Sequence, residues 1–245
     1  IDRVRRLSTS RNHSATHLLQ KALRTVLGTH VEQAGSYVTP DRLRFDFTHF
    51  AAMTPEEIQQ VEDIVNEKIL ESLPITISQE SIEDARKMGA MALFGEKYGN
   101  VVRVVNMGGY SIELCGGAHL ENTAQVGSFK IVSESGIASG VRRIEALTGA
   151  AALKHYQQQE EALKAVCKAV KATPDNMLKR IETLIAEQKQ TAKELESLKA
   201  KMAGGAADDI LSKAVDVKGM KVVCAEIKDA DANALRTMGD QLKNK

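Results

Sequence analysis

The 245-residue sequence lacks tryptophan altogether, and aromatic residues make up only 4% of it. We therefore expect any contact with nucleic acid to rely little on base stacking. The formal net charge of +1 argues against a wholly basic wrapper of nucleic acid, although it permits a local basic patch. The sequence also has no apolar run long enough to span a membrane and no recognisable signal peptide. These absences favour a globular protein that works in water.

Cysteine is scarce as well. The three cysteines, Cys115, Cys167 and Cys224, are scattered and odd in number, which fits a reducing cytosol better than a disulfide framework. The hydrophobic fraction of 43% and the charged fraction of 27% are typical of soluble globular proteins, and the length permits more than one domain. We expect a cytoplasmic location. Because the chain begins with Ile1 and not with methionine, we expect it to be a fragment.

Residues 1–147 mix helix and strand signals. Apolar residues recur at helical spacing from Leu18 to Leu27, and Thr54-Pro55 opens a second helix with a good N-cap and a proline at the first helical position. Further segments read as a short helix at 81–88 and as strands at 43–47, 75–77, 101–105, 110–114, 126–132 and 140–146. This pattern predicts an α+β domain with a largely antiparallel sheet and flanking helices.

Residues 148–203 read as helical. Thr173-Pro174 ends one helix and starts the next, and the second helix carries an imperfect heptad pattern flanked by glutamate and lysine. We predict an antiparallel helical hairpin, or coiled-coil linker, that serves as a connecting arm. Gly204-Gly205 predicts a linker to residues 204–245, where one strand at 221–227 and one helix at 230–242 cannot bury a core alone. That last region is interpreted as the start of an incomplete α/β C-terminal domain.

Two motifs carry potential metal ligands. His13 and His17 are four residues apart, so a helix would place both imidazoles on one face. A zinc protease would have glutamate directly after the first histidine, and Ser14 excludes that interpretation. Cys115 and His119 share the same spacing across a glycine pair. Three imidazoles and one thiol suit zinc, so the four residues are candidate ligands of one Zn²⁺ ion.

The glycine pair, Gly116-Gly117, adds a second feature to this motif. Glycines allow a tight turn and expose backbone N–H groups that suit a carbonyl or a phosphate as well as a metal. Taken alone, Cys115 reads equally as a small buried apolar residue and His119 as a loop histidine. Four protein ligands would close a tetrahedral site, which is the structural pattern, whereas catalytic zinc keeps a position for water. The sequence leaves open whether the metal is catalytic or positions a substrate.

Four stretches together resemble the editing domain of the alanyl-tRNA synthetases. They are His-Ser-Ala-Thr-His-Leu-Leu at 13–19, Arg-Phe-Asp-Phe at 44–47, Cys-Gly-Gly-Ala-His at 115–119 and Gly-Val-Arg-Arg-Ile-Glu-Ala at 140–146. Ala118 departs from the threonine that the family has more often. The resemblance continues through the helical region into the start of the family's C-terminal domain. It implies zinc-dependent hydrolysis of tRNA(Ala) mischarged with serine or glycine, with self-association through the C-terminal region. ATP-dependent alanine ligation would belong to an N-terminal part that this chain does not contain.

The resemblance suggests roles for pocket residues. Thr16 is a candidate acceptor for serine's hydroxyl, although a threonine inside a helix equally often bonds back to its own helix. Gln33 matches a position that the family places in the pocket; the alternative is an exposed turn residue. Backbone N–H groups of Gly116 and Gly117 are candidates for stabilising the developing oxyanion. No general base is indicated.

Arginines are the candidate tRNA contacts. Arg142 and Arg143 are consecutive, so in a strand they face opposite sides, and one could meet phosphate while the other pairs with Glu145 or Glu113. Arg11 belongs to a basic group near the first metal motif, which also contains Arg3, Arg5 and Arg6. The usual alternative for such charges is plain solvation.

Three functional hypotheses follow. The first is a zinc-dependent aminoacyl-tRNA deacylase within an alanine–tRNA ligase. The second is a non-catalytic tRNA-binding module with a structural zinc. A free-standing editing factor is disfavoured by the absent start methionine and the truncated last region, and the chain shows no ATP-binding signature.

Overall fold

A long N-terminal helix, α1 (Arg3–Leu27), organises the first part of the chain in the computed structural model, which describes residues 2–91, 99–226 and 232–243. The helix begins well before the predicted apolar stretch because Asp2 acts as N-cap, accepting hydrogen bonds from the N–H groups of Val4 and Arg5. The chain divides into two compact units, residues 1–161 and 162–245. Within the described residues, no helix is long and apolar enough to cross a membrane.

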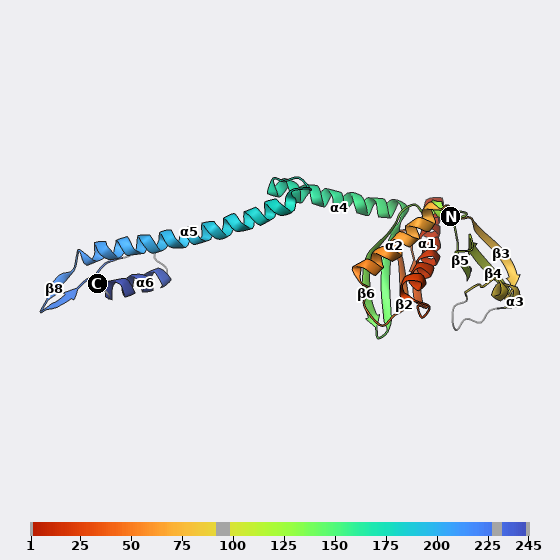
Figure 1. The fold of residues 1–245 in the computed structure, drawn as a ribbon, viewed down its shortest axis with the longest axis horizontal. Coiled ribbons are helices and arrows are strands. Elements are labelled where there is room, and N and C mark those ends of the chain that lie inside the picture. The colour runs from red at the N-terminus through yellow and green to blue at the C-terminus, as the bar shows by residue number, and fades with distance from the viewer. Residues whose placement is uncertain (1, 92–98, 227–231, 244–245) are drawn as a thin grey trace. The chain divides into compact units, whose positions relative to one another are not determined.

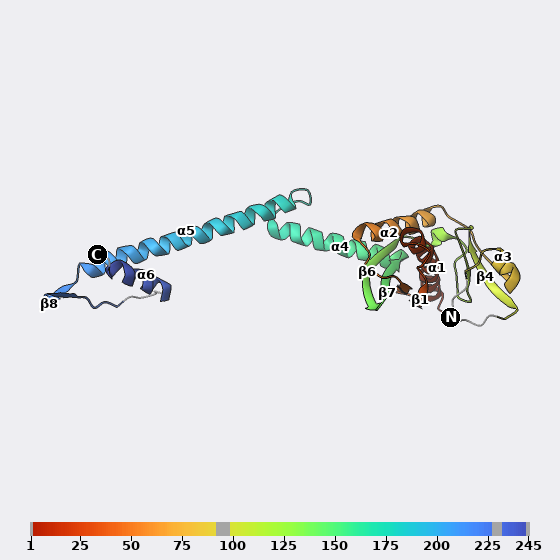
Figure 2. The same ribbon diagram turned by 60° about the horizontal axis from the view of Figure 1, so that its bottom comes forward.

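The larger sheet of the first unit has four antiparallel strands in the order β1-β2-β7-β6. They are β1 (Gln33–Val38), β2 (Leu43–Thr48), β7 (Val141–Thr148) and β6 (Phe129–Ala138). One face is apolar and packs against α1 and α2, forming a single core (Figure 1, Figure 2). The edge strand β1 was not predicted, because its mostly exposed, polar and glycine-containing sequence lacks an alternating apolar pattern.

Helix α2 (Pro55–Leu70) confirms its predicted start. Thr54 and Glu57 form a reciprocal capping box, and Pro55 occupies the first helical position. The helix is tied to β6 by polar side chains: Glu62 accepts a hydrogen bond from the N–H of Ile131, and Asn66 bonds to the backbone of β6 as well. The strand predicted at 126–132 starts later than expected, because η1 (Thr123–Val126) forms a 3₁₀ turn there.

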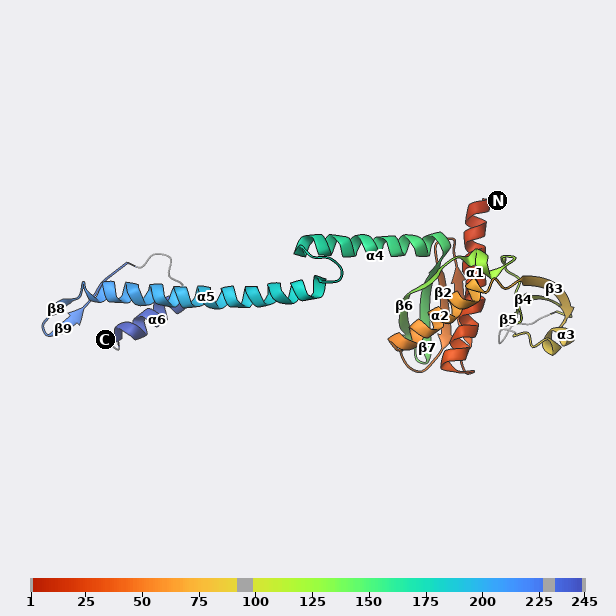
Figure 3. The same cartoon turned by 45° about the horizontal axis from the view of Figure 1, so that its top comes forward.

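A second sheet, in place of the single sheet expected, contains β3 (Ile75–Ser81), β4 (Val101–Met107) and β5 (Ser111–Leu114) in sequence order, all antiparallel. With α3 (Ile82–Lys87) it lies on the other side of α1 from the four-stranded sheet (Figure 3). Val105 and Met107 join the main core, whereas Val102 and Val104 pack with α3 in a smaller cluster. The smaller sheet is therefore fixed to the body of the unit through one face.

The helical region consists of α4 (Gly149–Val170) and α5 (Met177–Leu211), joined by a short turn. Around this turn Cys167 contacts Met177, with 3.7 Å between the sulfur atoms, and Arg180 Nε donates to the carbonyl of Val170. The antiparallel pairing of the two helices along their lengths stays a prediction. The predicted break at Gly204-Gly205 is wrong: α5 continues through both glycines, because a glycine costs a helix only about 1 kcal/mol relative to alanine.

The last part of the chain corrects a second expectation. Instead of one strand at 221–227 there is a hairpin of β8 (Val215–Val217) and β9 (Met220–Val222). Lys218 and Gly219 form its turn with φ of 51° and 80°, the left-handed pair that favours a two-residue hairpin turn. Residues 223–226 have no regular structure, and Ile227 lies outside the described residues. The helix predicted at 230–242 is α6 (Ala232–Lys243), which packs on α5; residues 230–231 lie outside the described part of the chain.

Candidate metal centre and adjoining pocket

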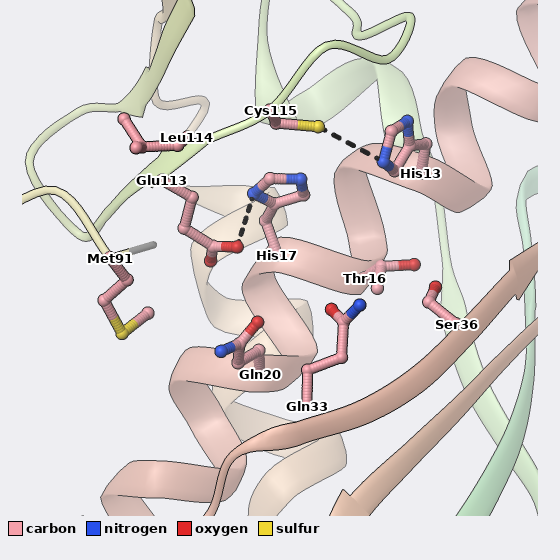
Figure 4. A pocket seen from close by; sticks show the side chains of 10 residues that line it. All are labelled: His13, Thr16, His17, Gln20, Gln33, Ser36, Met91, Glu113, Leu114 and Cys115. Atoms are coloured by element: carbon pink, nitrogen blue, oxygen red, sulfur yellow. Dashed lines mark hydrogen bonds and ion pairs between the residues drawn. The ribbon is translucent and has the colours of Figure 1, made fainter. Parts of the chain in front are cut away.

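The four predicted metal ligands come together in the folded chain. His13 and His17 project from one face of α1, and Cys115 and His119 come from the loop that follows β5. One ligand atom from each residue lies within 4.8 Å of all the others. Cys115 Sγ lies 3.5 Å from His13 Nε2 and 3.3 Å from His119 Nε2 (Figure 4 shows the first contact). Two histidines on one face of a helix and two residues of a loop about a hundred residues away therefore form one cluster.

Two of the distances between these atoms fit a zinc tetrahedron. Zinc bonds of about 2.0–2.3 Å to nitrogen and sulfur imply roughly 3.3–3.8 Å between neighbouring ligand atoms. The two sulfur–nitrogen distances of 3.5 and 3.3 Å lie at that separation. A three-histidine, one-thiolate donor set is also one that zinc accepts. The residues present thus suit a zinc ion in both chemistry and spacing.

Outer polar contacts orient the imidazoles. His17 Nδ1 lies 2.9 Å from Glu113 Oε2 (dashed in Figure 4), and the other carboxylate oxygen accepts a 2.6 Å hydrogen bond from Ser111 Oγ. His119 Nδ1 lies 3.2 Å from Ser14 Oγ. Both contacts occupy Nδ1 and leave Nε2 directed at the cluster, the arrangement by which outer partners fix a metal-binding tautomer.

The electrostatics of the cluster favour a thiolate. Burial alone would raise the pKa of Cys115, but hydrogen bonds from His119, His13 and His17 hold it far below its usual value. Burial likewise would lower the pKa of His17, whereas the Glu113 carboxylate and the Cys115 sulfur outweigh it and raise that pKa to about 10. Burial is the main cause of the lowered pKa of His119, which keeps that imidazole neutral and available as a ligand. Thiolate is the form that binds metal.

The glycine loop is shaped by contacts that the sequence did not reveal. Arg103, on β4, donates from Nη1 to the carbonyls of Cys115 at 2.7 Å and Gly117 at 2.6 Å. The Gly117 N–H donates to Cys115 Sγ at 3.4 Å. Gly117 packs so closely on the His13 ring that a Cβ would overlap Cε1 and Nδ1, whereas a Cβ on Gly116 would meet nothing within 4 Å. Neither glycine has a left-handed φ, so Gly117 is needed for space and not for conformational freedom.

A small pocket of about 90 Å³ opens beside the cluster (Figure 4). Thr16 and Gln33 both line it, and Gln33 begins a strand instead of occupying a turn. Thr16 Oγ1 also donates to the carbonyl of Asn12 at 2.9 Å, so its oxygen can only accept from a ligand. Five further lining residues were not predicted from the sequence: Gln20, Ser36, Met91, Glu113 and Leu114.

A helical-face argument could have found one of these. Gln20 lies four residues after Thr16 on α1, one turn further along the face that carries the metal ligands. The other four are Ser36 on β1, Glu113 and Leu114 on β5, and Met91, which forms an isolated bridge with Glu113; tertiary pairing alone brings them to the pocket.

The candidate tRNA arginines are engaged within the protein. Arg142 forms a two-pronged ion pair with Glu134, and Arg143 forms one with Asp46 at 2.7 and 2.8 Å. The predicted pairing of one of them with Glu145 or Glu113 is wrong: Arg42 pairs with Glu145, and Glu113 with His17. The cross-strand neighbours of β7 decide these partners.

The basic group near the metal motif divides in two. Arg11 Nε donates to the carbonyl of Gln125 at 2.8 Å and ties α1 to η1. In contrast, Arg3, Arg5 and Arg6 are exposed on the first turns of α1. Their contact with tRNA stays a prediction.

Replacing Glu113 with glutamine is expected to weaken zinc binding about 10- to 100-fold, the usual cost of losing an outer partner of a metal-binding histidine. The amide keeps the shape of the side chain but removes the charge that faces His17 Nδ1. Competition with a chelator of known affinity measures the effect. Glu121→Gln, at an exposed position beyond the loop that follows β5, is the matched control and should bind zinc like the parent chain. Equal zinc affinities for the two variants would contradict the role of Glu113 as an outer partner of His17.

Comparison with known proteins identifies the chain. The family described as "Threonyl and Alanyl tRNA synthetase second additional domain" matches residues 102–145. Over all 245 residues the chain is 61% identical to an alanine–tRNA ligase of Acetivibrio thermocellus and 56% identical to alanine–tRNA ligase 1 of Lachnoclostridium phytofermentans. It is 54% identical, again over its full length, to an alanine–tRNA ligase of Bacillus cytotoxicus.

The chain belongs to the alanyl-tRNA synthetase family. It spans 28% of the length of each of these alanyl-tRNA synthetases. The segment that matches the second additional domain runs from β4 into β7 and contains Arg103, Glu113, Cys115 and His119. The other half of the metal cluster, His13 and His17, comes from α1 outside that segment. The segment that matches the family model therefore contains the loop that contributes Cys115 and His119 to the cluster.

Proposed function

We propose that this chain carries a hydrolytic editing site that removes serine or glycine from mischarged tRNA(Ala), within an alanine–tRNA ligase. The observation that carries the proposal is the cluster of three histidines and one cysteine beside a small polar pocket. The family implies tRNA as the partner. Zinc is proposed as the metal on the donor set and the spacing described above.

The size and chemistry of the pocket support this choice of substrate. A pocket built for alanine cannot exclude glycine and rejects serine's hydroxyl only weakly, so a separate site has to select against them. A cavity of about 90 Å³ suits a small aminoacyl group. Because Thr16 Oγ1 already donates within its helix, it would accept a hydrogen bond from serine's hydroxyl. The Gln33 amide would hold the polar atoms of the same group.

The chemistry required is modest, because an aminoacyl ester is activated and needs mainly a positioned water and charge stabilisation. A bound zinc ion would supply positive charge beside the reacting carbonyl, held by His13, His17, Cys115 and His119. Since the Gly117 N–H is engaged by Cys115 Sγ, Gly116 is the N–H that we propose for the developing oxyanion. Glu113 orients His17 and is not proposed as a general base.

One structural observation supports a different function. The cluster offers four protein ligands, and four ligands close a tetrahedral zinc site. The alternative is therefore a non-catalytic tRNA-binding module in which zinc is purely structural. Such a module would bind tRNA and unfold on chelation, but it would not hydrolyse the ester.

The test combines metal analysis with deacylation assays. We expect the purified chain to hold one zinc ion and to release serine from Ser-tRNA(Ala) and glycine from Gly-tRNA(Ala), while Ala-tRNA(Ala), the matched control, is hydrolysed much more slowly. A zinc-loaded, folded chain that binds all three charged tRNAs and hydrolyses none would establish the structural alternative. A chain that binds no zinc would contradict both.

A further inference from the structure

Phe50 stands out from the other phenylalanine side chains that the structure describes. It follows β2 and is 82% exposed, whereas Phe45, Phe47 and Phe129 are fully buried. Its ring nevertheless has fixed neighbours: the ring centroids of His49 and His30 lie 4.6 and 5.5 Å away. One face of the phenyl ring is thus supported by imidazoles while much of its surface meets solvent.

The supporting histidines are themselves held in place. His30 Nε2 and His49 Nδ1 lie 2.9 Å apart and share a hydrogen bond, with an angle of 25° between their ring planes. The backbone is anchored as well, because Thr48 Oγ1 donates to the carbonyl of His30 and the His49 N–H donates to the carbonyl of Gly140. A rigid aromatic surface of this kind, named here the Phe50 platform (Phe50, His30 and His49), costs little entropy when a flat ligand stacks on it.

We propose that the Phe50 platform binds an unpaired nucleobase of RNA by stacking. Bases of single-stranded RNA stack on phenylalanine and histidine rings, and this contact tolerates any base because every base has a π-face. This departs from the expectation, drawn from the low aromatic content, that base stacking contributes little. What matters is the placement of three rings and not their number.

The position of the platform relative to the pocket supports RNA as its ligand. His30 precedes the pocket residue Gln33 by three residues, so their Cα atoms are at most roughly 11 Å apart. An RNA end that delivers an aminoacyl group to the pocket would pass within reach of Phe50. The identity of the RNA rests on the proposed function, whereas stacking itself can be measured without any ester.

The absence of tryptophan from the sequence gives a clean probe. Phe50→Trp creates a single tryptophan, whose fluorescence should be quenched when a short single-stranded RNA ending in CCA is added. An RNA with an abasic site at the stacked position should quench much less. Leu70→Trp is the matched control: Leu70 is 84% exposed at the far end of α2, a 16-residue helix about 24 Å long, and should not respond.

Binding measurements complete the test. Phe50→Ala should weaken the affinity for the intact RNA about 5- to 150-fold, the usual effect of removing one stacked aromatic ring, without changing the affinity for the abasic RNA. Phe50→Tyr should bind like the parent chain, and zinc content should be unchanged in every variant. No binding of RNA, equal quenching by intact and abasic RNA, or full affinity in Phe50→Leu would overturn the proposal. The last result would instead indicate an apolar surface for a protein segment. Because the RNA carries no amino acid, failure of editing activity would leave these outcomes unaffected.

Discussion

Replacing Cys115 with alanine is expected to remove zinc from the chain and to abolish deacylation of Ser-tRNA(Ala). Cys115 Sγ is the atom shared by the short contacts to His13 and His119, and three histidines hold it as thiolate. Its loss would remove a proposed ligand and the negative charge proposed to compensate the metal. We expect zinc affinity to fall more than ~100-fold, beyond the usual cost of losing an outer partner.

The matched control is Cys224→Ala, since Cys224 is an exposed free cysteine outside the first unit. Metal content by mass spectrometry and the melting temperature with and without added zinc should match the parent chain in this control. In Cys115→Ala, added zinc should no longer raise the melting temperature. Retention of both zinc and deacylation in Cys115→Ala would refute the proposed site.

Replacing Gly117 with alanine is expected to have nearly as large an effect, although glycine binds no metal. The added Cβ would occupy the space of the His13 ring, so either the ring or the Cys115–Gly117 loop has to move. Overpacking of this kind costs about 1–3 kcal/mol, and here the displaced group is a metal ligand. We expect loss of zinc and a lower melting temperature.

The neighbouring glycine provides the comparison for that result. A Cβ at Gly116 meets nothing within 4 Å, and the residue is exposed, so Gly116→Ala should change stability by less than about 0.5 kcal/mol and keep its zinc. Chelator competition and thermal unfolding, measured side by side, show whether Gly117→Ala loses zinc and stability while Gly116→Ala keeps both. If both variants bound zinc equally well, the close packing of Gly117 on His13 would not matter for the site.

Local sequence patterns predicted the features that depend on near neighbours. The spacing of His13 and His17, the N-cap at Thr54 and the alternation of Leu43 to Phe47 are all set within a few residues, and each is present in the structure. The metal cluster could be proposed because the residue types of the ligands and their spacing within each pair can be read directly from the sequence. The coarse fold class, helices with antiparallel sheets, follows from the same periodicities.

The features that escaped prediction depend on pairing across the chain. Arg103 bonds to a loop more than ten residues away, and Glu113 pairs with His17 across nearly a hundred residues. The division into two sheets has the same origin, since strand partners are chosen by tertiary packing. Gly204-Gly205 shows the opposite failure: a local signal for a break was overridden by the surrounding helix.

The cluster joins α1 to the end of β5, so the smaller sheet lies wholly inside the stretch of chain between His13 and Cys115. Contacts between residues so far apart in sequence are slow to form, because the entropy of closing a long loop has to be overcome first. We therefore expect the four ligands to meet only after the smaller sheet has docked on the core. Zinc would then bind late in folding, and only to chains in which the two sheets are already correctly assembled.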